Sequence, residues 1–150
     1  MKYVVAFAYT LLFAFPALAQ QPTVVDWSYE AKALGEQEYE LQFTATIQPG
    51  WYLYSQHLEE GGPIPTTVQI HEHPEVNVLS EVSESGDAVE GFDEMFGIDV
   101  KKFKKRAVFT QRVKVGESLE AITGYIEFMS CDEEKCLPPR EIPFTISFRG

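Results

Sequence analysis

The sequence has 150 residues, of which 23 are Asp or Glu and 12 are Lys or Arg, and its formal net charge at pH 7 is −11. An acidic chain without a basic stripe repels phosphate backbones, so nucleic acid is not an expected partner. Hydrophobic residues make up 45% of the chain, enough for one domain with its own core.

The chain opens with a segment typical of a secretory signal peptide. Residues 1–19 combine Lys2, an apolar run and the small residues Ala17 and Ala19. The apolar run is shorter than the roughly 20 residues that a membrane-spanning helix needs, and no later segment approaches that length. We therefore expect residues 1–19 to be removed on export and residues 20–150 to form one domain without a membrane span.

Beyond the signal segment, apolar and polar residues alternate with a period of two. In residues 39–47, this alternation places Tyr39, Leu41, Phe43, Ala45 and Ile47 on one face of a half-buried strand. The same pattern predicts strands at residues 24–29, 51–54, 67–71, 107–115, 121–128 and 142–148. No amphipathic helix is apparent. The pattern predicts an all-β protein, an immunoglobulin-like antiparallel β-sandwich.

Two stretches interrupt the strand pattern. Residues 55–65 are rich in glycine and proline and are expected to form a loop. Residues 85–106 are expected to form a long loop that packs on something, because Phe92, Met95 and Phe96 are too apolar to lie in water together. The basic end of that stretch, residues 101–106, is typical of a solvated edge strand guarded by lysines, although it could also dock an acidic partner or a membrane surface.

Histidines and aromatic residues raise two further possibilities. His71 and His73 lie two apart on a predicted strand, so they could share a face and bind a metal, but exposed histidines are the simpler interpretation. A cupredoxin-like copper site would also need a histidine after the cysteine, and that residue is missing. Trp51, Tyr52 and Tyr54 could form a platform for sugars or belong to the core. We expect no metal and no cofactor.

The only two cysteines, Cys131 and Cys136, are separated by four residues and followed by a Pro-Pro pair. They bracket a turn between two predicted strands, where a disulfide forms readily. Closing so short a loop restricts the unfolded chain by only about 2 kcal/mol, against nearly 5 kcal/mol for a loop of about 100 residues. The acids at 132–134 disfavour a thiolate, which suits a pair attacked by an activated thiol of a partner. A local structural disulfide and an exchanging pair both remain open.

Three segments resemble one family in the same order along the chain. The segment "GYIEFMSCDEEKCLPPREIPF" resembles the cysteine hairpin of the N-terminal periplasmic domain of the DsbD thiol:disulfide interchange proteins. The segment "PGWYLYS" resembles the aromatic strand of that domain, and "DEMFG" resembles its cap loop. Together the similarity spans essentially all of residues 20–150.

The resemblance implies a domain that relays reducing equivalents in the periplasm. A thioredoxin-like domain or protein would reduce the pair, which would then reduce periplasmic oxidoreductases or other disulfide-bonded proteins, as a component of a protein-disulfide reductase. Cys136 would form the mixed disulfide with partners, and Cys131 would resolve it. The cap loop and the lining of the site would comprise Asp93, Glu94, Met95, Phe96, Tyr52 and Tyr54.

Two features depart from the family pattern. The cysteines of the family are commonly separated by five residues, whereas four separate them here. The membrane-spanning and thioredoxin-like parts of DsbD do not occur in this sequence, so we expect the electron donor on another polypeptide. The alternative function is that of a non-catalytic exported sandwich that binds a ligand or protein, with Cys131 and Cys136 as a structural disulfide.

Overall fold

The computed structural model describes residues 22–148, so the expected signal peptide at residues 1–19 lies outside the described residues. The described residues form strands and connecting segments. In chain order the strands are β1 (Val25–Gly35), β2 (Glu38–Ile47), β3 (Tyr52–Tyr54), β4 (Thr67–Ile70), β5 (Val76–Val78), β6 (Ser83–Asp93), β7 (Ile98–Val115), β8 (Ala121–Phe128), β9 (Ser130–Cys131) and β10 (Arg140–Ser147). Between residues 22 and 148 there is no helix with the length and apolar character to cross a membrane.

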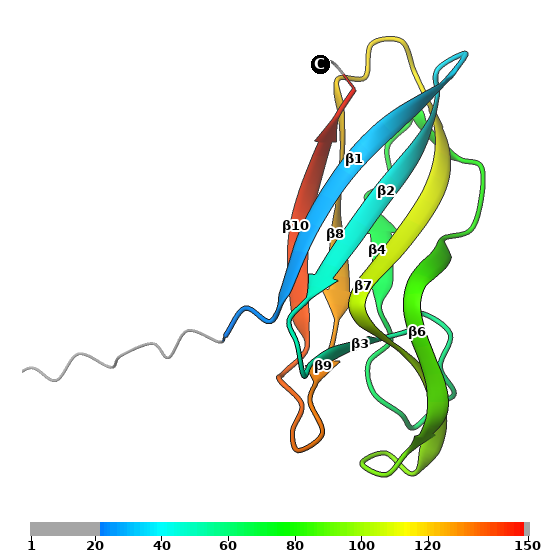
Figure 1. The fold of residues 1–150 in the computed structure, drawn as a ribbon. Helices are drawn as coiled ribbons and strands as arrows, with labels where there is room; N and C mark the ends of the chain where they lie inside the picture. The colour runs from blue at the N-terminus through cyan, green and yellow to red at the C-terminus, as the bar shows by residue number, and fades with distance from the viewer. Residues whose placement is uncertain (1–21, 149–150) are drawn as a thin grey trace, which may run out of the picture.

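The strands form two antiparallel sheets that face each other (Figure 1). The larger sheet has the order β1-β2-β7-β3-β9, with β5 and β6 also paired to β7. The smaller sheet has the order β10-β8-β4. This arrangement confirms the predicted immunoglobulin-like β-sandwich, with its hydrophobic core between the sheets.

The alternating strands supply that core. In β2, Leu41, Phe43 and Ala45 are completely buried, and they face Ile126 and Phe128 of β8 within one cluster. Each fully buried side chain of Leu or Phe size contributes about 1.5–3 kcal/mol relative to an exposed one. The period of two is therefore a consequence of one face of each strand being buried against the other sheet.

The expectation of a long loop at residues 85–106 is wrong. This stretch is a β-hairpin made of β6 and the first half of β7, which pair up to Asp93 and Ile98. Most of β6 is exposed, so no buried face imposes an alternation that the sequence could reveal. At the tip, the N–H of Gly97 donates to the carbonyl of Asp93 at 2.7 Å, and Gly97 has φ +71°, a conformation that favours glycine. The loop expected at residues 55–65 is confirmed.

The expectation of an edge strand at residues 101–106 is also wrong. These residues belong to β7, which lies inside the larger sheet and pairs there with β6 and β3. Lys101 and Lys102 therefore do not protect an unpaired strand edge. Lys101 forms an ion pair with Glu84, and Lys102 forms one with Asp93; the side chains of both acids are only 4% exposed. The basic run therefore neutralises two buried carboxylates of β6.

Candidate functional site

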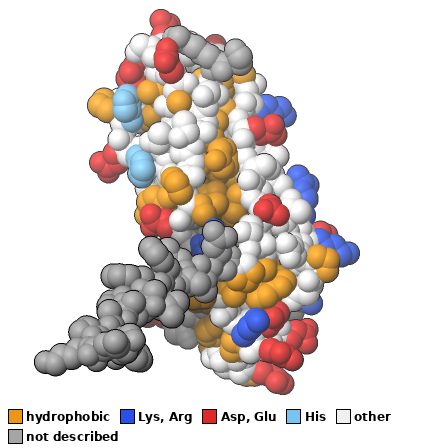
Figure 2. Space-filling view, turned by 90° about the vertical axis from the view of Figure 1, so that its left-hand side faces the viewer, with side chains coloured by type: hydrophobic (Ala, Val, Ile, Leu, Met, Phe, Trp, Pro, Cys, Tyr) orange, Lys and Arg blue, Asp and Glu red, His pale blue; other side chains and the backbone are white. Residues whose placement is uncertain are grey.

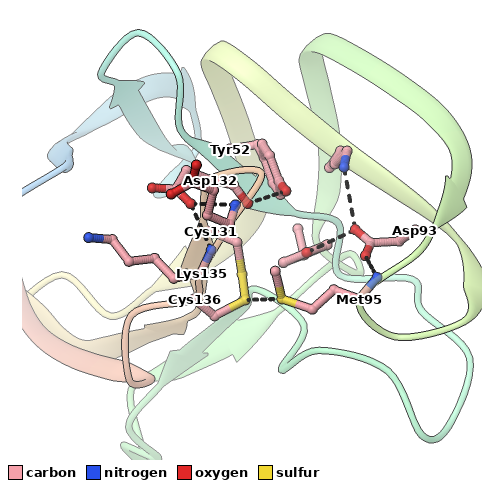
Figure 3. The surroundings of a disulfide bond; sticks show 10 residues. Tyr52, Asp93, Met95, Cys131, Asp132, Lys135 and Cys136 are labelled. Atoms are coloured by element: carbon pink, nitrogen blue, oxygen red, sulfur yellow. Dashed lines mark hydrogen bonds and ion pairs between the residues drawn. A yellow bond between two sulfur atoms is a disulfide. The ribbon is translucent and has the colours of Figure 1, made fainter.

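The two cysteines form a disulfide across a tight hairpin at the lower end of the sandwich (Figures 1 and 3). Cys131 ends β9 and lies opposite Cys136, with 4.0 Å between the Cα atoms. Two hydrogen bonds flank the pair, from Asp132 N to the Lys135 carbonyl and from Leu137 N to the Ser130 carbonyl, each 2.9 Å. The cysteines are thus a non-hydrogen-bonded pair, in which side chains approach closely enough to be bridged directly.

The carboxylate of Asp132 shapes the turn between the cysteines. Its Oδ1 atom accepts hydrogen bonds from the backbone N–H groups of Glu134 and Lys135, both at 2.8 Å. The N–H of Glu134, and next that of Lys135, lower the pKa of Asp132 because they stabilise its charged form. At neutral pH the carboxylate of Asp132 is therefore charged and holds the turn through these two hydrogen bonds.

The two sulfur-bearing residues differ in their access to solvent. Cys131 is completely buried, because its strand β9 pairs with β3 through Tyr52. Cys136 is partly exposed. A thiol that approaches from solvent therefore reaches Cys136 before Cys131.

The aromatic strand β3 lies directly behind the disulfide. Tyr52 and Tyr54 are both buried and lie edge to face, with ring centroids 5.8 Å apart. The hydroxyl of Tyr52 donates to the carbonyl of Asp132, which ties β3 to the cysteine turn. Since both rings are buried, they do not present a stacking surface for a sugar.

The tip of the β6–β7 hairpin contacts the disulfide from the other side (Figure 3). The Sδ atom of Met95 lies 3.3 Å from the Sγ atom of Cys136. Neither sulfur carries a hydrogen while the disulfide is intact, so this is a van der Waals contact. The ring of Phe96 lies edge-on to that of Tyr54, with centroids 6.0 Å apart. We name the turn 94–97, which carries Met95 and Phe96, the cap.

The structure does not place every apolar residue of this hairpin over the cysteines. Phe92 is 64% exposed and covers nothing, contrary to the sequence-based expectation. It precedes the buried Asp93, and successive residues of a strand point to opposite faces. Glu94 is also exposed at the tip. Within the cap, Phe96 packs against the cluster around the cysteines, and Met95 contacts Cys136 directly.

A buried carboxylate holds the cap in place. Asp93 accepts a hydrogen bond from the backbone N–H of Met95 at 3.0 Å, one from the hydroxyl of Tyr54 at 3.1 Å and one from Lys102 Nζ at 3.3 Å. Lys102 Nζ also lies 3.9 Å from the ring centroid of Tyr52, a cation–π contact. Burial, and next the charge of Asp93, raise the pKa of Tyr54, so the phenol stays protonated and donates.

Lys102 is a site residue that sequence reasoning missed. Its role depends on the pairing of Tyr54 with Lys102 across β3 and β7, which also brings Asp93 within reach. A run of four lysines and one arginine gives no signal that one of them faces a buried acid. Finding Lys102 would have required knowing which residues of β3 and β7 pair with each other.

A second buried carboxylate, Glu84, anchors the loop that follows β3. It accepts hydrogen bonds from Ser55 Oγ at 2.6 Å and Gln56 N at 2.9 Å, and Lys101 Nζ lies 3.1 Å away. Burial by itself raises the pKa of Glu84, but the hydrogen bonds from these three partners outweigh it, so the pKa is lowered overall. Sequence reasoning missed this contact, because Glu84 lies on β6, a strand without an alternation of apolar and polar residues.

The two histidines considered as a metal pair, His71 and His73, make hydrogen bonds to other residues. His71 Nδ1 lies 3.2 Å from the hydroxyl of Thr123, and His73 Nδ1 accepts from the N–H of Glu75 at 3.2 Å. Between residues 22 and 148, no group of three or more His, Cys, Asp or Glu side chains is placed to hold a metal ion.

Fold and site together define a class of protein: an immunoglobulin-like sandwich that carries a covered cysteine pair at one end. The family model described as "Thiol:disulfide interchange protein DsbD, N-terminal" matches residues 19–147, and the chain belongs to this family. Its members take part in thiol:disulfide exchange, as the description states. A search of curated proteins finds no match.

Two solved structures show the same fold at low sequence identity. The reduced N-terminal domain of DsbD from Neisseria meningitidis is 20% identical, with a TM-score of 0.56, and the match covers 87% of this chain and 91% of that one. The N-terminal periplasmic domain of ScsB from Proteus mirabilis is 18% identical, with a TM-score of 0.57. That match covers 82% of this chain and 45% of that one.

Proposed function

We propose that this domain is a periplasmic thiol:disulfide exchange module that relays electrons through Cys131 and Cys136. A thioredoxin-like domain or protein donates the electrons, and oxidised periplasmic oxidoreductases or other disulfide-bonded proteins accept them. The observation that carries the proposal is the asymmetry of the disulfide: Cys131 is completely buried, whereas Cys136 is partly exposed beneath a small cap. The signal-peptide pattern of residues 1–19 and the family membership support this location.

The exchange begins at the accessible sulfur. A thiolate of the donor attacks Cys136 Sγ, the bond between the two cysteine sulfurs breaks, and Cys131 leaves as a thiolate that takes up a proton. A second donor thiol then attacks the donor sulfur of the mixed disulfide and releases Cys136 as a thiol. The donor becomes a disulfide, and this domain gains two electrons and two protons. The same steps in reverse reduce an acceptor.

The surroundings of the disulfide indicate which side supplies the activated thiol. Acidic side chains gather at the lower end of the molecule (Figure 2), the end that carries the disulfide hairpin, and Glu133 and Glu134 are exposed in the turn. Negative charge disfavours a thiolate here. A donor with a basic surface around its cysteine has both a thiol of lowered pKa and a surface complementary to this end.

The cap regulates access in this proposal. Met95 covers part of Cys136, with 3.3 Å between its Sδ atom and Cys136 Sγ, and so restricts the approach of an attacking sulfur. The cap must therefore move before exchange, and a docking partner can displace it by offering replacement contacts to Met95 and Phe96. Small thiols make no such contacts and react slowly.

Single-cysteine variants test the proposal. Cys131→Ala should form a stable mixed disulfide through Cys136 with an oxidised thioredoxin-like domain, because no resolving thiol remains. Cys136→Ala should form none, because its remaining thiol is buried. Non-reducing electrophoresis and mass spectrometry report the adduct, and circular dichroism checks the fold.

Other outcomes are equally informative. Trapping of Cys136→Ala alone would reverse the two roles. If neither variant forms an adduct, and the wild-type pair titrates below about −300 mV against a thiol buffer, the disulfide is structural and the proposal is wrong.

A further inference from the structure

Three sulfur atoms converge at the lower end of the sandwich. Cys131 and Cys136 are bonded to each other, and Met95 Sδ lies 3.3 Å from Cys136 Sγ (Figure 3). Thiol exchange does not require sulfur at the position of Met95, because any apolar side chain of similar size would shield the disulfide. When the pair is reduced, the same place presents two thiols and one thioether.

This donor set contains sulfur alone. Among the described residues, no His, Asp or Glu side chain joins the two cysteines in a group that could hold a metal ion. Two carboxylates of this site are already engaged: Asp93 binds Lys102 and Tyr54, and Asp132 holds the turn. Thiolate and thioether ligands select Cu(I), whereas Zn²⁺ sites complete four-fold coordination with thiolate, imidazole or carboxylate.

The spacing of the sulfurs fits a three-coordinate ion. With metal–sulfur bonds of about 2.3 Å, three sulfurs around an ion lie about 4 Å from one another. The Sδ atom of Met95 and the Sγ atom of Cys136 are 3.3 Å apart in this structure. This distance is shorter than the spacing around an ion by less than the diameter of an atom. Breaking the disulfide lets the two cysteine sulfurs separate, while the hairpin keeps their Cα atoms opposite each other, 4.0 Å apart in this structure.

The third ligand is held in place before any ion arrives. The backbone N–H of Met95 is bound to the buried Asp93, and the Gly97 N–H closes the same turn. Tyr52, Tyr54 and Phe96 pack around the sulfurs and limit the access of water. A ligand that is already positioned loses little conformational entropy on binding.

We propose that the reduced domain binds one Cu(I) ion through Cys131, Cys136 and Met95. The two thiols release two protons to solvent, the ion keeps its charge, and no electron is transferred. The oxidised domain does not bind, because its disulfide offers no thiolate. Copper thus stabilises the dithiol form and withdraws it from exchange. This site differs from the cupredoxin type that the sequence argues against, because it uses no histidine. It requires only that the pair can be reduced, not that a protein partner reduces it.

The test is a competition titration without oxygen. The full chain is reduced with dithiothreitol, freed of reductant and titrated with Cu(I) against the chromophoric chelator bathocuproine disulfonate. Wild type should take up one Cu(I) per chain, and the oxidised protein none. Met95→Leu keeps an apolar side chain of similar volume but lacks the sulfur. It should bind at least about tenfold more weakly, since even the loss of a group that only orients a ligand costs 10–100-fold.

X-ray absorption at the copper edge identifies the ligands. Wild type should show three sulfur neighbours, and Met95→Leu should show two. Met129→Leu is the matched control, because it removes the methionine next to the cysteine hairpin and should leave the affinity unchanged. Equal affinity and equal sulfur counts in wild type and Met95→Leu would overturn the proposal, as would a loss confined to Met129→Leu. Failure to compete at all would also overturn it. Because the reductant is a small molecule, these outcomes do not depend on the relay function.

Discussion

The cap makes a quantitative prediction for the reaction of the oxidised domain with dithiothreitol. Met95 is 44% exposed, so about half of its side chain is buried in the contact, and Phe96 is also partly buried. Full burial of such side chains contributes about 1.5–3 kcal/mol, so each half-buried residue holds the cap closed by about 1 kcal/mol. Replacing both with alanine should weaken closure by about 2 kcal/mol.

This free energy converts directly into a rate. If small thiols react only with the open form, each 1.4 kcal/mol changes the rate about tenfold. The double variant Met95→Ala/Phe96→Ala should therefore react about 30-fold faster than wild type, and Met95→Ala alone about fivefold faster. Stopped-flow measurement at several thiol concentrations gives the second-order rate constants. Circular dichroism and thermal unfolding confirm that the fold is intact.

The same hairpin offers a matched control. Phe92 is 64% exposed and makes no contact with the cysteines, so Phe92→Ala should leave the rate unchanged. It removes a large apolar side chain three residues from Met95 and therefore tests general loosening of the hairpin. An unchanged rate in the folded double variant would refute the reasoning, because the cap would then not limit access to Cys136. An equal acceleration in Phe92→Ala would refute it as well.

Two further predictions concern stability. Reducing the bond between Cys131 and Cys136 should cost about 2 kcal/mol or less in denaturant unfolding, because the loop is short, and loss of cooperative unfolding would favour a structural disulfide. Glu84→Gln should cost about 1–3 kcal/mol at pH 7, because a buried carboxylate loses its charged hydrogen bonds. Since the pKa of Glu84 is lowered on folding, its stabilisation is present above the unfolded pKa of about 4.3 and is lost as pH falls through the folded value. The difference between Glu84→Gln and wild type should therefore shrink in acid, and a difference independent of pH would contradict this assignment.

The sequence predicts those parts of the fold in which one face of a strand is buried. The alternation in β2 and β8 follows from burial of Phe43 and Ile126 between the sheets, so it reveals both strands. Strand β6 shows no such alternation of apolar and polar residues, because it lies outside the core and pairs only with β7. Its backbone hydrogen bonds stabilise a hairpin without selecting side chains, which is why residues 85–106 look like a loop.

Only part of the candidate site can likewise be predicted from the sequence. Local motifs predict the cysteine turn and the aromatic strand, and the order of motifs places Met95 near them. The polar contacts beneath the cap depend on register across three strands, which no local pattern encodes. Asp93, Tyr54 and Lys102 come from β6, β3 and β7, and they meet only because β7 pairs with both neighbours. The motifs therefore point to Met95, which contacts Cys136 in the structure, but give no signal for Lys102, which binds Asp93 beneath it.

The position of Asp93 indicates which part of the hairpin would move in the proposed opening of the cap. Its carboxylate is fixed by Tyr54 and Lys102, two residues of the sheet interior, so Asp93 itself belongs to the rigid part of the domain. Met95 and Phe96 lie beyond it, in a turn held by the N–H groups of Met95 and Gly97. Opening the cap requires these few contacts to break, while the ladder between β6 and β7 stays intact. In the proposed exchange, a rigid hairpin whose short end opens would expose Cys136 at small entropic cost and would return Met95 to the same sulfur afterwards.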